Sequence, residues 1–332
     1  MVVPPIYWSA PCLAVLVALA AACSGRGDVA PSAAPSVVDV RWESLPPLPT
    51  PRSEVAAASD DDRIIVAGGF DAGGGSVATV EIFDLATGTW STGPDLPVPL
   101  NHPMAAAFDD TVVVLGGYLG PGLRTPTDRV FALRGDRWEE LAPMPEPRGA
   151  GGAATADGRL VVAGGVGTDG LADEAFVFDL AAGTWSRIEG PPTAREHLGV
   201  AGLGRDIYVV GGRTGGIGSN LASAEALDVE RVRWQELPRM PTARGGSAAT
   251  ATTNGFVVSA GGEADRAFGE VEAFDVGTGR WLSLPHMPTE RHGLGVVAVG
   301  TVVYTIAGGT VPGLSVSDAV EAVDLASLRS AG

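Results

Sequence analysis

The 332-residue sequence contains no lysine, two cysteines and few aromatic residues, and these scarcities exclude several kinds of protein. Both cysteines, Cys12 and Cys23, lie near the start of the chain, so the residues beyond them form neither a disulfide nor a thiolate metal site. Acidic residues outnumber basic ones by 39 to 22, and the formal net charge is −17. This charge argues against nucleic acid as a partner and against electrostatic docking on anionic lipid.

The apolar run near the N-terminus, residues 13–22, is too short to span a bilayer but suits the core of a signal peptide. It ends at Cys23, and small residues before a cysteine resemble a bacterial lipobox, in which that cysteine is lipidated. We expect residues 1–23 to be a signal peptide of the lipoprotein type and residues 24–40, rich in Gly, Ala, Pro and Ser, to be a flexible linker. The alternative is an ordinary cleavage site with Cys23 incidental. The protein is therefore expected outside the cytoplasm, anchored to a membrane by lipid or otherwise secreted.

Glycine doublets recur through the rest of the chain at intervals of 48, 48, 47, 50 and 47 residues, each after a run of β-forming residues. Six tryptophans keep the same period. A period near 50 residues with several strands in each unit is typical of a radial β-array, whose repeats bury their faces against one another. The doublets are Gly68-Gly69, Gly116-Gly117, Gly164-Gly165, Gly211-Gly212, Gly261-Gly262 and Gly308-Gly309, and the tryptophans are Trp42, Trp90, Trp138, Trp185, Trp234 and Trp281.

Each repeat combines an apolar strand ending in Gly-Gly, a strand of the type Val-Glu-x-Phe-Asp, a tryptophan, and a Leu-Pro-x-Met-Pro segment followed by arginine. Examples are residues 64–69 (IIVAGG), 80–84 (VEIFD), 271–275 (VEAFD) and 284–288 (LPHMP). This pattern resembles the kelch-repeat β-propeller family, in its exported bacterial type, and covers residues 41–328. The resemblance implies an all-β fold: a six-bladed kelch propeller with four-stranded blades.

The order of the strands predicts how the ring closes and which face binds. The chain starts with an outer strand at residues 40–45 and ends with a third strand at residues 320–324, so the N-terminal strand is expected to complete the last blade. In an antiparallel meander, the arginine segments and the loops after the Gly-Gly doublets lie on the same face. These loops are the longest ones, and long loops on a rigid scaffold usually carry binding. We call this the loop-rich face.

The arginine after the Leu-Pro segment occurs in five repeats, with Leu100 in its place in the second. A ring of guanidinium groups could bind carboxylates of an acidic sugar or peptide. Alternatively, each arginine pairs with an acid of the repeat strand and serves as scaffold, which the sequence favours for most of the five. The arginines are Arg52, Arg148, Arg195, Arg244 and Arg291, and the acids are Glu81, Glu225, Glu272 and Glu321.

Histidines fall in the same segments. His102, His197 and His292 begin inner strands of alternate blades and could together hold Zn²⁺. However, His292 is one residue off the register of the other two, and adjacent strand positions face opposite ways. We therefore expect no metal and no cofactor. The acid and base candidates on the loop-rich face are Glu54, Glu196, Glu263 and Asp265, and no catalytic residue is assigned.

The predicted function is a binding module for a protein or glycan partner at the cell envelope, with a membrane contact through the lipid anchor and no nucleic acid. The alternative is a carbohydrate enzyme similar to sialic acid mutarotases (N-acetylneuraminate epimerase type), with Glu196, Arg195 and Arg244 as candidates. A galactose-oxidase-like copper enzyme is excluded, because its cofactor needs a cysteine cross-linked to a tyrosine. The predicted ligand-binding residues are Arg148, Arg195, Glu196, His197, Arg213, Arg244, Arg291, His292, His102 and Tyr118.

Overall fold

The computed structural model describes residue 1, residues 40–60 and residues 62–328. Residues 2–39, which include most of the predicted signal peptide, the predicted lipidation site Cys23 and nearly all of the predicted linker, lie outside the described residues. Within the described residues, no helix has the length and the apolar character that crossing a membrane requires.

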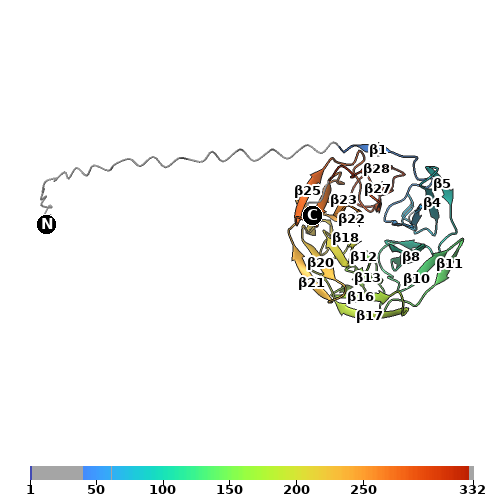
Figure 1. Ribbon diagram of the computed structural model, residues 1–332, viewed down its shortest axis with the longest axis horizontal. Coiled ribbons are helices and arrows are strands. Elements are labelled where there is room, and N and C mark those ends of the chain that lie inside the picture. Colours follow the sequence, from blue (N-terminus) through green and yellow to red (C-terminus); the bar gives the residue numbers. More distant parts are fainter. Residues whose placement is uncertain (2–39, 61, 329–332) are drawn as a thin grey trace. The chain divides into compact units, whose positions relative to one another are not determined.

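Six four-stranded antiparallel sheets are arranged in a ring (Figure 1), which confirms the predicted all-β, six-bladed propeller. In each of the first five blades the strands follow one another outward from the axis. Blade one contains β2 (Ala56–Ser59), β3 (Arg63–Ala67), β4 (Val80–Asp84) and β5 (Thr89–Thr92); blade two contains β7 (Met104–Phe108), β8 (Thr111–Leu115), β10 (Val130–Arg134) and β11 (Arg137–Glu140); blade three contains β12 (Gly152–Ala156), β13 (Arg159–Ala163), β16 (Glu174–Asp179) and β17 (Thr184–Glu189).

The second half of the ring repeats this plan. Blade four contains β18 (Gly199–Leu203), β19 (Asp206–Val210), β20 (Ala224–Asp228) and β21 (Arg233–Leu237); blade five contains β22 (Gly245–Ala251), β23 (Phe256–Glu263), β24 (Val271–Asp275) and β25 (Arg280–Leu284); blade six contains β26 (Gly295–Val299), β27 (Val302–Ile306), β28 (Val320–Asp324) and β1 (Trp42–Ser44). Small elements on the loops are the ribbons β6 (Leu100–Asn101) with β9 (Tyr118–Leu119) and β14 (Val166–Gly167) with β15 (Gly170–Leu171), and the 3₁₀ turn η1 (Ile217–Ser219).

Alternating apolar faces bury the blades against one another. All five residues of β8 are buried, because its two faces pack against neighbouring blades. One core cluster, for example, joins Ile65 and Val80 of blade one to Val112 and Phe131 of blade two. The inner strands are rich in alanine, glycine and valine, since small side chains fit where the strands crowd the axis.

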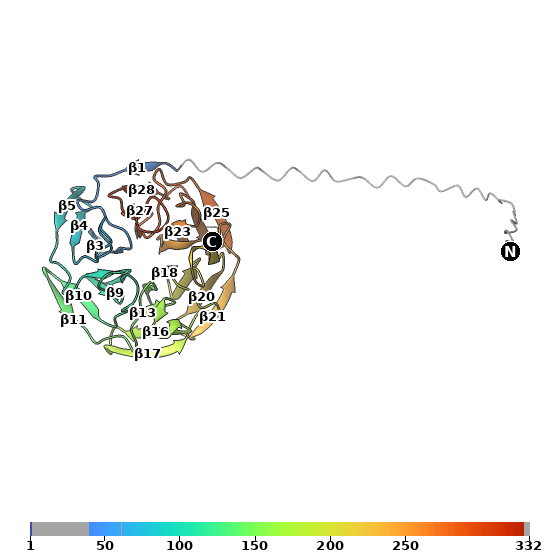
Figure 2. The ribbon, with the colours of Figure 1, turned by 180° about the vertical axis from the view of Figure 1, so that it is seen from behind.

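The ring closes through β1, which pairs antiparallel with β28 in the register Trp42↔Val323 and Ser44↔Glu321. Figures 1 and 2 show the first strand of the chain beside the last one. The predicted closure by the N-terminal strand is therefore confirmed, and both open edges are paired.

The repeated tryptophans fasten each blade to the blade before it. The indole Nε1 of Trp90 donates to the carbonyl oxygen of Pro46 at 2.9 Å, and Trp138 donates to Pro94 at 2.8 Å. Trp42 closes the series across the ring junction by donating to Pro285 at 2.9 Å. The tryptophans thus make structural contacts between blades.

Candidate functional site

The repeat arginines are buried inside their own blades. Arg52 is fully buried, donates to the carbonyls of Gly68 and Thr79 at 2.7 and 2.8 Å, and pairs with Glu81 at 2.7 Å. Arg195, Arg244 and Arg291 repeat this arrangement with Glu225, Glu272 and Glu321. Their charge is neutralised within the scaffold, so we leave Arg195, Arg244 and Arg291 out of the candidate site.

Arg148 lacks an acid partner because Phe176 occupies the acid position. Its guanidinium lies over the ring of Phe176, 4.3 Å from the centroid, and donates to the carbonyls of Gly164 and Glu174 at 3.1 Å. A cation–π contact replaces the ion pair here. Arg148 is 1% exposed, which also assigns it to the scaffold.

Two residues after the arginine position, each blade places one residue at the pore axis, and we call these six residues the axis positions. They share an unusual backbone, because all six have a positive φ between 49° and 71°. Glycine adopts this conformation freely, whereas other residues, apart from Asn, Asp and His, adopt it rarely. The axis positions are Glu54, His102, Ala150, His197, Gly246 and Gly293.

The backbone of the axis positions forms a closed belt. Each amide N–H donates to the carbonyl oxygen of the axis position in the preceding blade, with N···O distances from 2.7 to 3.4 Å. The amide of Glu54 accordingly donates to Gly293, which joins blade one to blade six. The belt holds the four non-glycine residues in their left-handed conformation and directs their side chains to one place.

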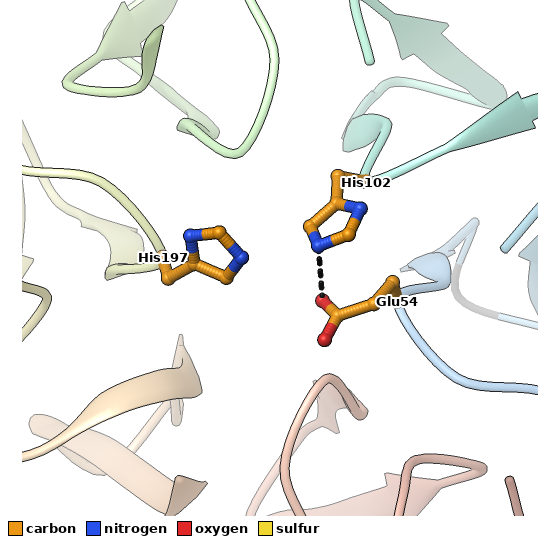
Figure 3. Close-up of side chains that lie close together, drawn as sticks. All are labelled: Glu54, His102 and His197. Atoms are coloured by element: carbon orange, nitrogen blue, oxygen red, sulfur yellow. Dashed lines mark ion pairs between the residues drawn. The ribbon is translucent and has the colours of Figure 1, made fainter. Parts of the chain in front are cut away.

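Three of these side chains, Glu54, His102 and His197, come together in the pore (Figure 3). The Nε2 of His102 lies 3.2 Å from a carboxylate oxygen of Glu54, and the two imidazole rings meet edge to face with centroids 4.8 Å apart. One ligand atom from each of the three residues falls within 4.8 Å of the others. We call these three residues the axial cluster.

The ring of His102 is held from its far side by Asn101. The Nδ1 of His102 lies 2.7 Å from the side-chain oxygen of Asn101, so Nδ1 carries the proton and donates it. The amide group of Asn101 is oriented by its own nitrogen, which donates to Ser76 and to the carbonyls of Gly120 and Gly122. The neutral form of His102 therefore presents an unprotonated Nε2 to Glu54.

His197 is held in the same way by Glu196. Its Nδ1 lies 2.8 Å from one oxygen of Glu196, while the other oxygen of Glu196 accepts from Arg213 at 2.9 Å. Arg213 also donates to Glu263 at 2.8 Å, which links blades four and five above the belt. Of the predicted site residues, His102, Glu196, His197 and Arg213 are thus brought together by the structure.

His292 and Tyr118 stand beside the axial cluster. His292 precedes its axis position by one residue, as the register predicted, and its Nε2 donates to the carbonyl of Gly313 at 2.8 Å. It also lies 3.4 Å from Glu263. Tyr118 is 1% exposed and packs edge-on against His102, with ring centroids 5.9 Å apart. Tyr118 therefore supports the histidine from below the surface.

A pocket of about 320 Å³ opens over the axial cluster on the loop-rich face. Its floor is polar and includes the axial cluster, Arg213 and Glu263, and its upper wall carries Phe70, Leu123, Ile217 and Leu314 from the loops. The isolated bridges Ser53↔Phe70 and Glu196↔Arg213 confirm that arginine segments and Gly-Gly loops share this face. We call this space the pore-mouth pocket.

Burial and charge set the ionisation of the floor. Burial acts to raise the pKa of Glu54, but the neighbouring His102, His197, His292 and Arg213 outweigh it and lower that pKa to about 2. Burial lowers the pKa of His102 to about 4, against the opposing effect of Glu54. Burial would lower the pKa of Arg213, yet its bonds to Glu196 and Glu263 raise it. At neutral pH the floor thus presents a carboxylate and a neutral imidazole in contact.

The fold and this floor define a six-bladed β-propeller with an acid–base cluster in its pore. The model of the KLHDC2/KLHL20/DRC7 Kelch-repeats domain matches residues 36–191 and 105–309, so the chain belongs to this Kelch-repeat family. The exported bacterial type remains a prediction.

Curated relatives match over short segments. Human Kelch-like protein 34 is 33% identical over 92 residues, which are 28% of this chain and 14% of that protein. Rat Kelch domain-containing protein 8B is 38% identical over 71 residues, 20% of each chain. The chain therefore spans a fifth or less of these relatives. The solved structure of YjhT matches 84% of this chain and 99% of its own, with a TM-score of 0.69 and 16% identity, which establishes a similar fold.

Sequence reasoning missed the role of Glu54. It was one of several acid candidates, but it was left out of the predicted ligand-binding residues. Its distance of two residues from Arg52 equals the distance of His197 from Arg195. This shared offset was the available signal, because equal offsets place side chains at equal positions around a propeller axis.

Proposed function

We propose that the pore-mouth pocket binds a small carbohydrate and that the axial cluster catalyses the interconversion of its anomers. The observation that carries the proposal is the buried contact of 3.2 Å between Glu54 and His102 on the floor of the pocket. A volume of about 320 Å³ is in the range of small-molecule sites. The resemblance to exported kelch propellers of the sialic acid mutarotase type supports the same class of substrate.

Anomer interconversion needs proton transfer and no redox partner. His102 accepts the proton of the anomeric hydroxyl through Nε2, and the carboxylate of Glu54 stabilises the imidazolium. The imidazolium returns the proton to the ring oxygen while the C–O bond of the ring breaks and a carbonyl forms. The reverse steps close the ring on the other face, so that no proton is consumed. Arg195 and Arg244, which the sequence suggested as candidates for this activity, have no part in the scheme because both are buried in the scaffold.

The test is the rate of anomer equilibration, followed by NMR, for N-acetylneuraminate and for a neutral hexose. We expect the purified protein to exceed the buffer rate, and His102→Asn to reduce the enzymatic rate by about 100-fold or more. Asparagine suits this test because it tolerates the left-handed backbone. Thr87→Ala, in a short turn between β4 and β5, is the control and should retain the wild-type rate. A wild-type rate equal to buffer for both sugars would refute the proposal.

A second candidate, a binding module for a protein partner, is favoured by the apolar loops around the pocket. Leu123, Val311 and Leu314 are 45%, 56% and 57% exposed, an unusual exposure for aliphatic side chains grouped on loops of one face. In-cell cross-linking tests this candidate when the cross-linked products of the wild type are compared with those of a Leu123→Ser/Leu314→Ser double variant. Loss of a cross-linked partner in the double variant would support binding, and an unchanged pattern would argue against it.

A further inference from the structure

We propose that Glu54, His102 and His197 form a binding site for a divalent transition-metal ion, Zn²⁺ in the first instance, on the axis of the propeller. This inference goes beyond the proposed function, since it concerns the metal alone and requires no sugar. It also revises the expectation that the pore holds no metal. That expectation considered His292 as the third ligand, whereas the structure brings Glu54 to this place.

The donor atoms of the axial cluster lie close enough together to hold one metal ion. Glu54, His102 and His197 occupy equivalent axis positions in blades one, two and four, and a donor atom of each lies within 4.8 Å of the others. The contact between Glu54 and His102 is 3.2 Å. In a tetrahedral zinc site with bonds of about 2.0–2.1 Å, two ligand atoms are separated by roughly 3.4 Å. Modest side-chain rotation would therefore complete a three-ligand site.

The two imidazole rings are oriented as metal-bound histidines usually are. Metal-bound histidines usually donate their other N–H to a carboxylate or a carbonyl group, which fixes the ring and its tautomer. His197 donates from Nδ1 to the carboxylate of Glu196, and His102 donates from Nδ1 to the amide oxygen of Asn101. In the neutral rings both Nε2 atoms then carry lone pairs, and one of these faces a carboxylate oxygen at 3.2 Å. The lone pair of His102 Nε2 and the carboxylate oxygen of Glu54 repel each other, and a cation placed between these two atoms would attract both.

The net charge of the groups on the pocket floor favours a bound cation. The carboxylates of Glu54, Glu196 and Glu263 and the guanidinium of Arg213 lie on one pocket floor or directly beside it. These three carboxylates and one guanidinium sum to a formal charge of −2. A divalent cation bound among these groups compensates this charge.

The backbone conformation of Glu54 brings its side chain to the histidines. Glu54 holds φ = 52°, a conformation that is costly for this residue type and that persists only where the surroundings impose it. The belt of backbone hydrogen bonds imposes it here, and two of the six axis positions use glycine instead. The belt thereby places the carboxylate of Glu54 beside the two histidines.

The donor set indicates which metal fits. Two imidazole nitrogens and one carboxylate oxygen suit Zn²⁺ and also Fe²⁺, whereas Mg²⁺ and Ca²⁺ prefer sites built from oxygen alone. All three ligands line the pore-mouth pocket, so a metal that they hold would be accessible to a molecule bound there. A metal bound there would occupy the Nε2 of His102 and would supply Lewis-acid activation of the sugar hydroxyl in its place.

The experiment is a calorimetric titration of the purified, chelator-stripped protein with Zn²⁺, without any sugar. We expect one equivalent to bind and the melting temperature to rise with Zn²⁺. Co²⁺ should give the intense visible absorption of a tetrahedral site. His102→Asn, His197→Asn and Glu54→Gln should each lose about 100-fold or more in Zn²⁺ affinity, since changes to the supporting partners alone typically cost 10–100-fold. His286→Ala, which removes an exposed histidine outside the pocket, is the matched control and should bind as wild type does.

Melting curves without metal separate lost ligands from lost folding. Glu54→Gln keeps the size of the side chain, so it decides the matter if a histidine variant fails to fold. Absence of Zn²⁺ and Co²⁺ binding by wild type, or equal binding by all three variants, would overturn the proposal. Failure of the sugar assay leaves this result untouched, because the titration contains no sugar; the two proposals therefore fail or succeed separately.

Discussion

Arg52 and Arg148 occupy the same position in two blades and satisfy their charge by different means. Arg52 faces the buried carboxylate of Glu81, and Arg148 faces the ring of Phe176. Both also donate to two backbone carbonyls. The position therefore tolerates two partners, but the two solutions leave different groups behind when the arginine is removed.

We expect Arg52→Leu to destabilise the fold more than Arg148→Leu. Loss of Arg52 leaves Glu81 buried and unpaired by a cation, which typically costs about 3–5 kcal/mol, whereas loss of Arg148 leaves no carboxylate behind. Unfolding free energies from urea titration provide the measurement. Arg129→Leu, which removes the exposed pair with Glu140, is the control and should cost about 1 kcal/mol or less. Equal losses for Arg52→Leu and Arg148→Leu would contradict this assignment.

At this scale the sequence predicted part of the site. The scaffold role of most arginines could be inferred, because an arginine and a glutamate recur in the same repeats. The axial cluster was not recognised as a unit. The shared offset from the arginine position marks equivalent places around the axis, but it does not reveal the positive φ value of 52° at Glu54. Glutamate does not suggest that conformation, and the belt that imposes it involves six blades.

The strand β1 is short, yet it is the outer strand of blade six, whose other three strands come from the C-terminal end of the chain. Leu48, just beyond β1, is 1% exposed, and Val40 packs with Leu325 in the core cluster that joins blades five and six. The pairing of β1 with β28 therefore joins the ends of the propeller by hydrogen bonds and by apolar burial.

Deletion of residues 41–48 should lower the thermal midpoint by about 10 °C or more, because β28 loses its partner and several buried side chains are exposed. Deletion of residues 24–38, which lie outside the described structure, is the matched truncation and should leave the midpoint unchanged. Differential scanning calorimetry of both proteins gives the comparison. Equal midpoints would mean that β1 contributes nothing to ring stability.

The elements themselves were predictable because each repeat carries the same local signals. A strand that ends in Gly-Gly, a tryptophan and a Leu-Pro segment recur with a period near 50 residues, and each unit folds as one blade. The small ribbons β6–β9 and β14–β15 were not predicted. They lie in loops of different length, where no repeated pattern guides the assignment.

At the scale of the whole molecule, we propose that the propeller is exported and held at a membrane through Cys23. Mass spectrometry of the membrane fraction should then find an acylated N-terminal cysteine, because the lipobox-like segment places Cys23 at the cleavage point. Cys23→Ser should release the protein from the membrane. A mature chain that is recovered entirely in the soluble fraction and begins at another residue would contradict the anchor.

The belt of six backbone hydrogen bonds separates architecture from chemistry in the pore. Each axis position has the same backbone geometry, whichever side chain it carries, and three of the six now carry Glu54, His102 and His197. Related propellers could therefore rotate, extend or erase such a site by single substitutions, while the ring itself stays intact. A change of pore chemistry on this belt needs no change of fold, only different side chains at the axis positions.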